Sequence, residues 1–191
     1  MVHGGLRRRH RGKDSPIAFV TDEIRALIDV PGPRFAAPGP LGADELRRFV
    51  QAVMEPDPVH WDAEAARASR YGGLVAPPLY VLHAARRAPG TPDPLDRLEA
   101  EPDWDGLDVG AGFGGLPPLE IPLTRVLNGG TEAELFRLPQ LGEVIEAQSR
   151  YVDIVDREGR SGPMVLATIE TEYRTRDGAI LARVRNTVIM R

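Results

Sequence analysis

The stretch from Pro163 to Met190 reads PMVLATIETEYRTRDGAILARVRNTVIM. Apolar residues alternate with polar ones along both of its halves: Val165, Ala167, Ile169 and Tyr173 in the first, and Ile180, Ala182, Val184 and Val188 in the second. A period of two is typical of a strand with one buried face. Asp177-Gly178, between the halves, is a strong signal for a tight turn. The stretch therefore predicts two antiparallel strands, over 163–175 and 179–190.

Two more strands are expected upstream, near 123–136 and 143–155. Helical periodicity comes earlier in the chain and predicts helices over 21–29 and 43–54, a short piece at 63–69 and an apolar helix over 79–87. Pro31 and Pro33 end the first helix, whereas Pro77 and Pro78 suit the first turn of the last one. An antiparallel sheet with one apolar helix to cover it indicates an α+β domain in which the sheet wraps that helix.

The bulk composition narrows the class of protein. The chain has 191 residues, 42% of them hydrophobic, which suits one domain over 19–191 with a long loop at about 88–122. Residues 1–18 form a basic tail that we expect to be disordered. The remainder is acidic, which argues against nucleic acid as a partner. No apolar run reaches the roughly 18 residues of a membrane span, so we expect a cytoplasmic protein that does not bind membranes.

Chemistry must come from histidines, carboxylates and hydroxyls, because the chain has no cysteine and only four histidines. One of these, His60, lies in the loop Glu55-Pro56-Asp57-Pro58-Val59-His60-Trp61-Asp62, which two prolines stiffen. A histidine near a carboxylate can act as a general acid or base on water. The residues alone also fit a loop histidine with a purely structural hydrogen bond. In either case we expect a loop residue to contribute little to the core.

This loop, followed by Tyr71-Gly72-Gly73-Leu74-Val75-Ala76-Pro77-Pro78 and then Leu127-Asn128-Gly129-Gly130, resembles the MaoC-like hydratase/dehydratase family. The resemblance is closer to the family's N-terminal, FAS1-like dehydratase branch. R-specific enoyl thioester hydratases of the family carry the pattern G-D-x-N-P-x-H-x-D, whose places are taken here by Met54, Glu55, Asp57, Pro58, His60 and Asp62. The resemblance implies a hot dog fold, in which an antiparallel sheet wraps a central helix.

The resemblance also implies a reaction: hydration of a 2-enoyl thioester, or dehydration of a 3-hydroxyacyl thioester, carried by coenzyme A or an acyl carrier protein. His60 would be the acid or base, and Glu55 or Asp57 would orient the water. The residues implied in substrate binding are Val75, Ala76, Tyr80, Asn128, Gly129 and Gly130. No cofactor or metal is expected beyond the coenzyme A or phosphopantetheine of the substrate. Addition of an amine, or thioester hydrolysis, is an alternative in the same fold.

Two departures from the pattern keep a second role open. Glu55 replaces the family's aspartate and Asp57 its asparagine, so either carboxylate could serve His60. Pro77 and Pro78 fall where the family has His-Gly, whose backbone N–H binds the thioester oxygen, and proline has no N–H. The alternative is therefore a non-catalytic acyl-binding subunit of a heterodimeric dehydratase. We expect a homodimer, or a heterodimer with another hot dog protein, since association would cover a free sheet edge.

Overall fold

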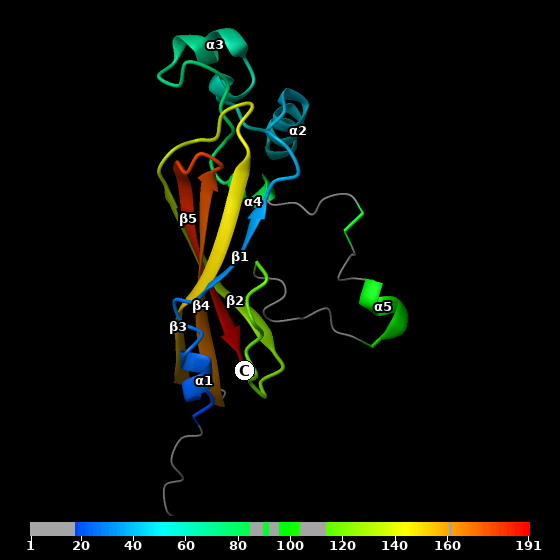
Figure 1. Cartoon of the computed structure of the whole chain (residues 1–191), viewed down its shortest axis with the longest axis vertical. Helices are drawn as coiled ribbons and strands as arrows, with labels where there is room; N and C mark the ends of the chain where they lie inside the picture. Colours follow the sequence, from blue (N-terminus) through cyan, green and yellow to red (C-terminus); the bar gives the residue numbers. More distant parts are fainter. Residues whose placement is uncertain (1–17, 85–89, 92–95, 104–113, 161) are drawn as a thin grey trace, which may run out of the picture.

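A five-stranded antiparallel sheet forms the body of the molecule in the computed structural model (Figure 1). The structure describes residues 18–84, 90–91, 96–103, 114–160 and 162–191. The strands are β1 (Pro31–Ala36), β2 (Val126–Leu135), β3 (Ile145–Gly159), β4 (Gly162–Thr175) and β5 (Ile180–Met190), and they lie in the order β1-β3-β4-β5-β2. The helices are α1 (Asp22–Arg25), α2 (Ala43–Val53), η1 (Pro58–His60), α3 (Ala63–Ala68), α4 (Val81–Ala84) and α5 (Arg97–Ala100).

The four strands expected in the second half of the chain are confirmed, but β1 is a strand that we did not predict. We expected Pro31 and Pro33 only to end the preceding helix, yet both lie within β1. Proline is tolerated there because β1 is an edge strand that pairs with β3 alone, and its register shifts between Pro31 and Arg34. Its residues are mostly exposed, so no alternation marked the strand in the sequence.

The helices begin close to where capping residues place them. Thr21 caps α1, and its hydroxyl accepts a hydrogen bond from the backbone N–H of Ile24 at 3.3 Å. The apolar helix predicted over 79–87 is present as α4, whose residues are Val81–Ala84; positions 85–87 lie outside the described residues. None of the helices that the structure describes is long and apolar enough to cross a membrane.

The start predicted for that helix was wrong. Pro77 and Pro78 precede α4 instead of forming its first turn, because Leu79 has a φ of 65°. A left-handed residue cannot continue a right-handed helix. The two prolines are therefore part of the connection that leads into α4.

Two apolar clusters occupy the covered face of the sheet. The first joins α2 and α4 to the sheet through Leu46, Val50, Tyr80, Val81, Ala147, Tyr173 and Val184. The second joins α1 and the segment 116–126 to the sheet through Ile24, Leu116, Leu119, Tyr151, Ile169 and Val188. In Figure 1, α2 and α3 lie at one end of the long axis and α1 at the other. The sheet thus carries a separate set of covering elements at each end.

The last part of the long loop expected at 88–122, residues 114–122, packs onto the sheet. Leu116 and Leu119 are buried, and Gly114 lies against β3. A Cβ on Gly114 would fall 2.5 Å from the hydroxyl oxygen of Ser149, and its φ of +67° also favours glycine. Residues 104–113 of the loop, with Trp104 and Phe113, lie outside the described residues.

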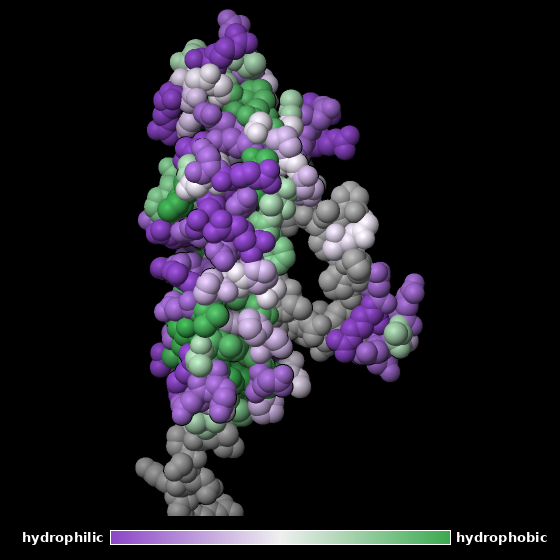
Figure 2. Space-filling view, in the orientation of Figure 1, coloured by the Kyte–Doolittle hydropathy of each residue, from purple (hydrophilic) through white to green (hydrophobic). Residues whose placement is uncertain are grey.

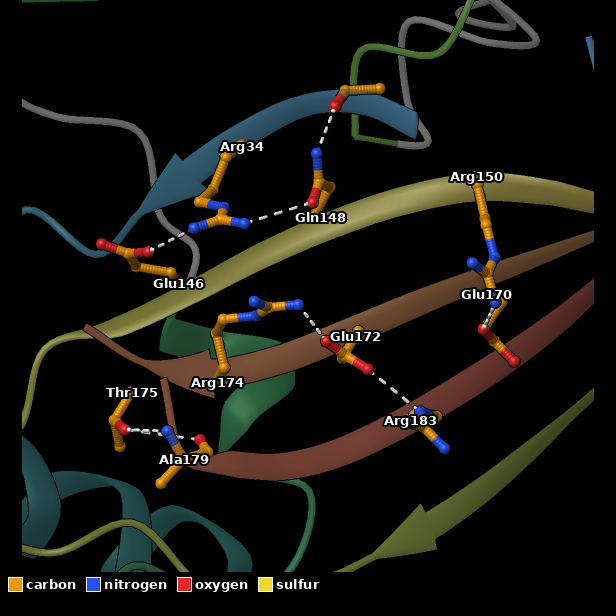
Figure 3. Close-up of polar contacts among 11 residues, drawn as sticks. Arg34, Glu146, Gln148, Arg150, Glu170, Glu172, Arg174, Thr175, Ala179 and Arg183 are labelled. Atoms are coloured by element: carbon orange, nitrogen blue, oxygen red, sulfur yellow. Dashed lines mark hydrogen bonds and ion pairs between the residues drawn. The ribbon is translucent and has the colours of Figure 1, made fainter. Parts of the chain in front are cut away.

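On the face of the sheet opposite the two apolar clusters, charged side chains form a ladder across β3, β4 and β5 (Figure 3). Glu170, only 4% exposed, bonds Arg150 at 2.7 Å and Arg185 at 2.9 Å. Glu172 bonds Arg174 and Arg183 in the same way. Figure 2 shows a mainly hydrophilic surface across the middle of the visible face, with the most extensive hydrophobic surface lower down and smaller patches near the upper end. A pocket lies over this ladder, but the charged side chains that line it are ion-paired with one another, so it is not a candidate site.

Candidate functional site

The loop that carries His60 leaves α2 at Met54, which has left-handed dihedrals (φ 53°, ψ 45°). Met54 takes the place of the first glycine in the pattern G-D-x-N-P-x-H-x-D. Glycine suits this position because it adopts left-handed dihedrals without steric cost. Met54 keeps that conformation as a residue that is 84% exposed. The turn aims the chain away from α2 and into the proline-stiffened segment.

Each of the three carboxylates in this segment accepts a hydrogen bond from a nearby backbone N–H. Glu55 accepts from the N–H of Asp57 at 3.1 Å, and Asp57 caps η1 by accepting from Val59 at 3.1 Å. Asp62 caps α3 by accepting from Glu64 at 2.8 Å and Ala65 at 3.0 Å. The carboxylates therefore shape the loop, as short acidic side chains do at turns and helix starts.

His60 itself is buried, with 4% of its surface exposed, so our expectation that it contributes little to the core was wrong. Its Nδ1 lies 2.8 Å from the carbonyl oxygen of Val75. A carbonyl oxygen only accepts, so Nδ1 carries the proton and donates it. In the neutral ring the lone pair is then on Nε2, to which no described residue is hydrogen-bonded. An imidazole in this state can take a proton at Nε2.

The structure brings some of the predicted site residues together. Val75 contacts the His60 ring through its carbonyl, and Ala76, fully buried, follows it. Tyr80 is 1% exposed in the cluster under α4, where its ring meets that of Phe49 edge-on with centroids 5.1 Å apart. Glu55 is half-buried and Asp57 exposed, and the bonds described above join them to the loop backbone and not to His60.

Asn128, Gly129 and Gly130 lie elsewhere, on the edge strand β2. A bulge interrupts the pairing of β2 with β5 between Asn128 and Gly130, and the Asn128 side chain accepts from the N–H of Gly130 at 2.8 Å. The three residues are exposed. Within one chain, nothing described joins them to His60.

Two further features bear on the chemistry. The residues that the structure describes include no group of three or more histidine, cysteine, aspartate or glutamate side chains that could hold a metal ion. Pro77 and Pro78 offer no N–H, so the first backbone N–H after them belongs to Leu79, whose φ of 65° is a strained conformation.

Comparisons with known proteins identify the family of this chain. The model of the family described as the FAS1-like dehydratase domain region matches residues 36–184, which include the His60 loop and most of the sheet. The chain belongs to this family. One relative of this chain is the UPF0336 protein of Saccharopolyspora erythraea. The two are 25% identical over 151 residues, which are 79% of this chain and 81% of that protein.

Solved structures also resemble this chain, at lower sequence identity. The ChsH1-ChsH2 complex of Mycobacterium tuberculosis matches with a TM-score of 0.61 and 18% identity, over 84% of this chain and 83% of that one. The HadBC (3R-hydroxyacyl-ACP dehydratase) complex of the same organism matches with a TM-score of 0.53 and 17% identity, over 85% and 98%. Such likeness shows the fold, which is the hot dog fold, as the sequence predicted.

Proposed function

We propose that this chain catalyses hydration of a 2-enoyl thioester, or the reverse dehydration of a 3-hydroxyacyl thioester, with His60 as the acid/base. The observation that carries the proposal is the hydrogen bond from His60 Nδ1 to the Val75 carbonyl, which leaves Nε2 able to accept a proton. A base at Nε2 would take a proton from water as the water attacks the β carbon. Membership of a dehydratase family supports this reaction class.

Glu55 is our candidate for the group that orients the water. It is half-buried, and among the described residues the one hydrogen bond of its carboxylate is from the backbone N–H of Asp57 to Oε1, which leaves Oε2 available. Asp57 is exposed. A carboxylate sheltered from solvent interacts more strongly with a bound water than an exposed one does.

A non-catalytic acyl-binding subunit is the second candidate, because one observation favours it. The turn before α4 begins with Pro77 and Pro78, which cannot donate to a thioester oxygen. Loss of one oxyanion donor costs on the order of 3 kcal/mol of transition-state stabilisation. Two solved structures of the same fold are complexes named for two components, which supports a hot dog partner for this chain.

A turnover assay with the purified full chain separates these candidates. We expect the protein alone to hydrate a trans-2-enoyl thioester of coenzyme A, seen as loss of the ultraviolet absorbance of the conjugated thioester. An inert chain that gains activity only with a second hot dog protein, at a rate unaffected by replacing His60, would establish the accessory role.

A further inference from the structure

The Val75 carbonyl, which accepts from His60, belongs to the stretch 71–76. Both ends of this stretch are hydrogen-bonded to the turn that contains Pro139 and Gln140. Ala76, directly after Val75, donates its backbone N–H to the carbonyl of Pro139 at 2.8 Å. Val75 forms an isolated antiparallel bridge with Gln140. At the other end, the Gln140 side-chain amide donates from Nε2 to the carbonyl of Tyr71 at 3.1 Å. Gln140 thus contacts both ends of the stretch 71–76.

The turn that carries Gln140 is itself held firmly. The backbone N–H of Gln140 donates to one carboxylate oxygen of Glu143 at 2.8 Å, and the other oxygen accepts from Arg137 at 2.8 Å. Gly142, with a φ of 86°, lies in the turn and donates to the carbonyl of Leu41 at 2.9 Å. Leu41 donates in return to the carbonyl of Glu143, also at 2.9 Å. The turn is therefore a rigid support for what it binds.

The clamped stretch needs such a support, because it contains Gly72 and Gly73. Glycine pairs have wide conformational freedom, and Gly72 stands at a φ of 69°. The planar peptide that carries the Val75 carbonyl is held on one side by the bond from the Ala76 N–H to Pro139, and the bond from Gln140 to Tyr71 holds the chain on the other side. Without the Gln140 bond, the chain between Tyr71 and Val75 would move more freely and the Val75 carbonyl would be held less firmly in direction. The proton of the His60 ring would then be less strongly confined to Nδ1.

We propose that Gln140 is a positioning residue for His60: its side chain completes the restraint on the Val75 carbonyl and, through it, favours the Nδ1–H tautomer of the ring. The effect on the tautomer follows from the hydrogen bonds alone. The effect on turnover rests on the proposed function, in which Nε2 must be free to take a proton. A misplacement of a catalytic group by about 1 Å can lower the rate about 100-fold.

NMR of the ¹⁵N-labelled full chain tests the tautomer directly. Two-bond ¹H–¹⁵N spectra distinguish Nδ1–H from Nε2–H rings, and the His60→Gln variant identifies the His60 signals by their absence. We expect the Nδ1–H form in the wild type and a mixture of both tautomers in Gln140→Ala and Gln140→Glu. Gln140→Glu keeps the size of the side chain but replaces its donor with an acceptor. In both variants kcat should fall by about 10-fold or more while KM changes by less than about twofold.

Gln148→Ala is the matched control. The Gln148 amide also donates to a distant backbone carbonyl, that of Gly32 at 2.9 Å, but this bond joins β3 to β1 and leaves the stretch 71–76 untouched. The control should leave the His60 tautomer and kcat unchanged.

Three results would overturn the inference: a wild-type ring without a proton on Nδ1, an unchanged tautomer in folded Gln140→Glu, or unfolding of both Gln140 variants while Gln148→Ala folds. In the last case the bond would be structural. A tautomer shift in a chain that turns over no enoyl thioester would instead refute the proposed function and leave the positioning role in place.

Discussion

Glu55 and Asp57 differ in ways that a pair of charge-removing substitutions can measure. Glu55→Gln and Asp57→Asn both keep the oxygen that accepts from the loop backbone, so the loop geometry should persist. We expect Glu55→Gln to lower kcat by about 10-fold to 100-fold, as for loss of a water-orienting group, and Asp57→Asn to lower it by less than about threefold. Initial-rate kinetics on an enoyl thioester give both values. Equal losses, or the larger loss in Asp57→Asn, would show that Glu55 is not the orienting carboxylate.

The sequence predicted which residues form the His60 loop but not which atoms they bond. Spacing suggested that a carboxylate partners the imidazole, whereas the carboxylates accept from backbone N–H groups two or three residues away. Short-range bonds of this kind compete with any longer-range partner, and residue spacing cannot rank them. The partner of His60, the Val75 carbonyl, is a backbone atom 15 residues away, and a residue pattern carries no sign of it.

At the scale of elements, Tyr151 on β3 predicts how the fold responds to alkaline pH. Burial raises the pKa of Tyr151 to about 12, and its hydroxyl donates to the carbonyl of Pro117 at 2.9 Å. The tyrosines of the unfolded chain lose their protons near pH 10. The folded chain therefore favours the protonated phenol of Tyr151 more than the unfolded chain does. This contribution to the free energy of unfolding is complete below about pH 10 and is lost as the pH rises from about 10 to about 12. Burial raises the pKa of Tyr173 to about 12 as well, so two residues contribute.

Replacing Tyr151 by Phe should reduce this alkaline loss without abolishing it. At pH 8 the variant should be less stable by about 1 kcal/mol, because it lacks the hydrogen bond to Pro117. Between pH 10 and pH 12 its free energy of unfolding should fall less steeply than that of the wild type. Urea unfolding followed by circular dichroism across this pH range provides the comparison. Parallel curves would mean that Tyr151 ionises as readily in the folded chain as in the unfolded one.

The elements that could be predicted are those whose burial follows a regular period. β4 and β5 are buried on one face, and their alternation was legible in the sequence. β1 could not be predicted, because an exposed edge strand has no alternation and its prolines suggested a break. The start of α4 was misplaced because the left-handed conformation of Leu79 is set by its surroundings and not by a preference of leucine.

At the scale of the whole molecule, β2 forms one edge of the sheet, and no strand that the structure describes pairs with its outer side. It pairs only with β5, and its residues are almost all exposed, with Leu127 at 38% and Leu135 at 44%. An exposed edge strand of this length presents unpaired backbone N–H and C=O groups, which can pair with another chain. We therefore expect light scattering at micromolar concentration to give twice the mass of the 20.9 kDa chain. A monomer, both with and without acyl ligand, would contradict this.

A proline on β2 tests whether this edge is where the chains meet. Phe136 donates its N–H to Leu181 of β5, and alternation along the strand then directs the N–H of Ala133 away from β5. Ala133→Pro should remove a donor from the free edge while keeping the pairing with β5, and should yield folded monomer. Ala133→Val, which keeps the N–H, should remain a dimer. Dimers of Ala133→Pro as stable as the wild type would place the interface elsewhere.

The assignment of His60 as the acid/base is the central claim about the chemistry of this chain. Because His60 is buried, His60→Ala could reduce folding as well as chemistry, so His60→Asn is the sharper variant. Its Nδ2 takes the place of Nδ1 and can still donate to the Val75 carbonyl, but the amide cannot act as a base at neutral pH. The decisive measurement is kcat/KM of folded His60→Asn on a trans-2-enoyl thioester, beside an active wild type. We expect a loss of roughly 100-fold or more. Wild-type turnover by His60→Asn would contradict the assignment.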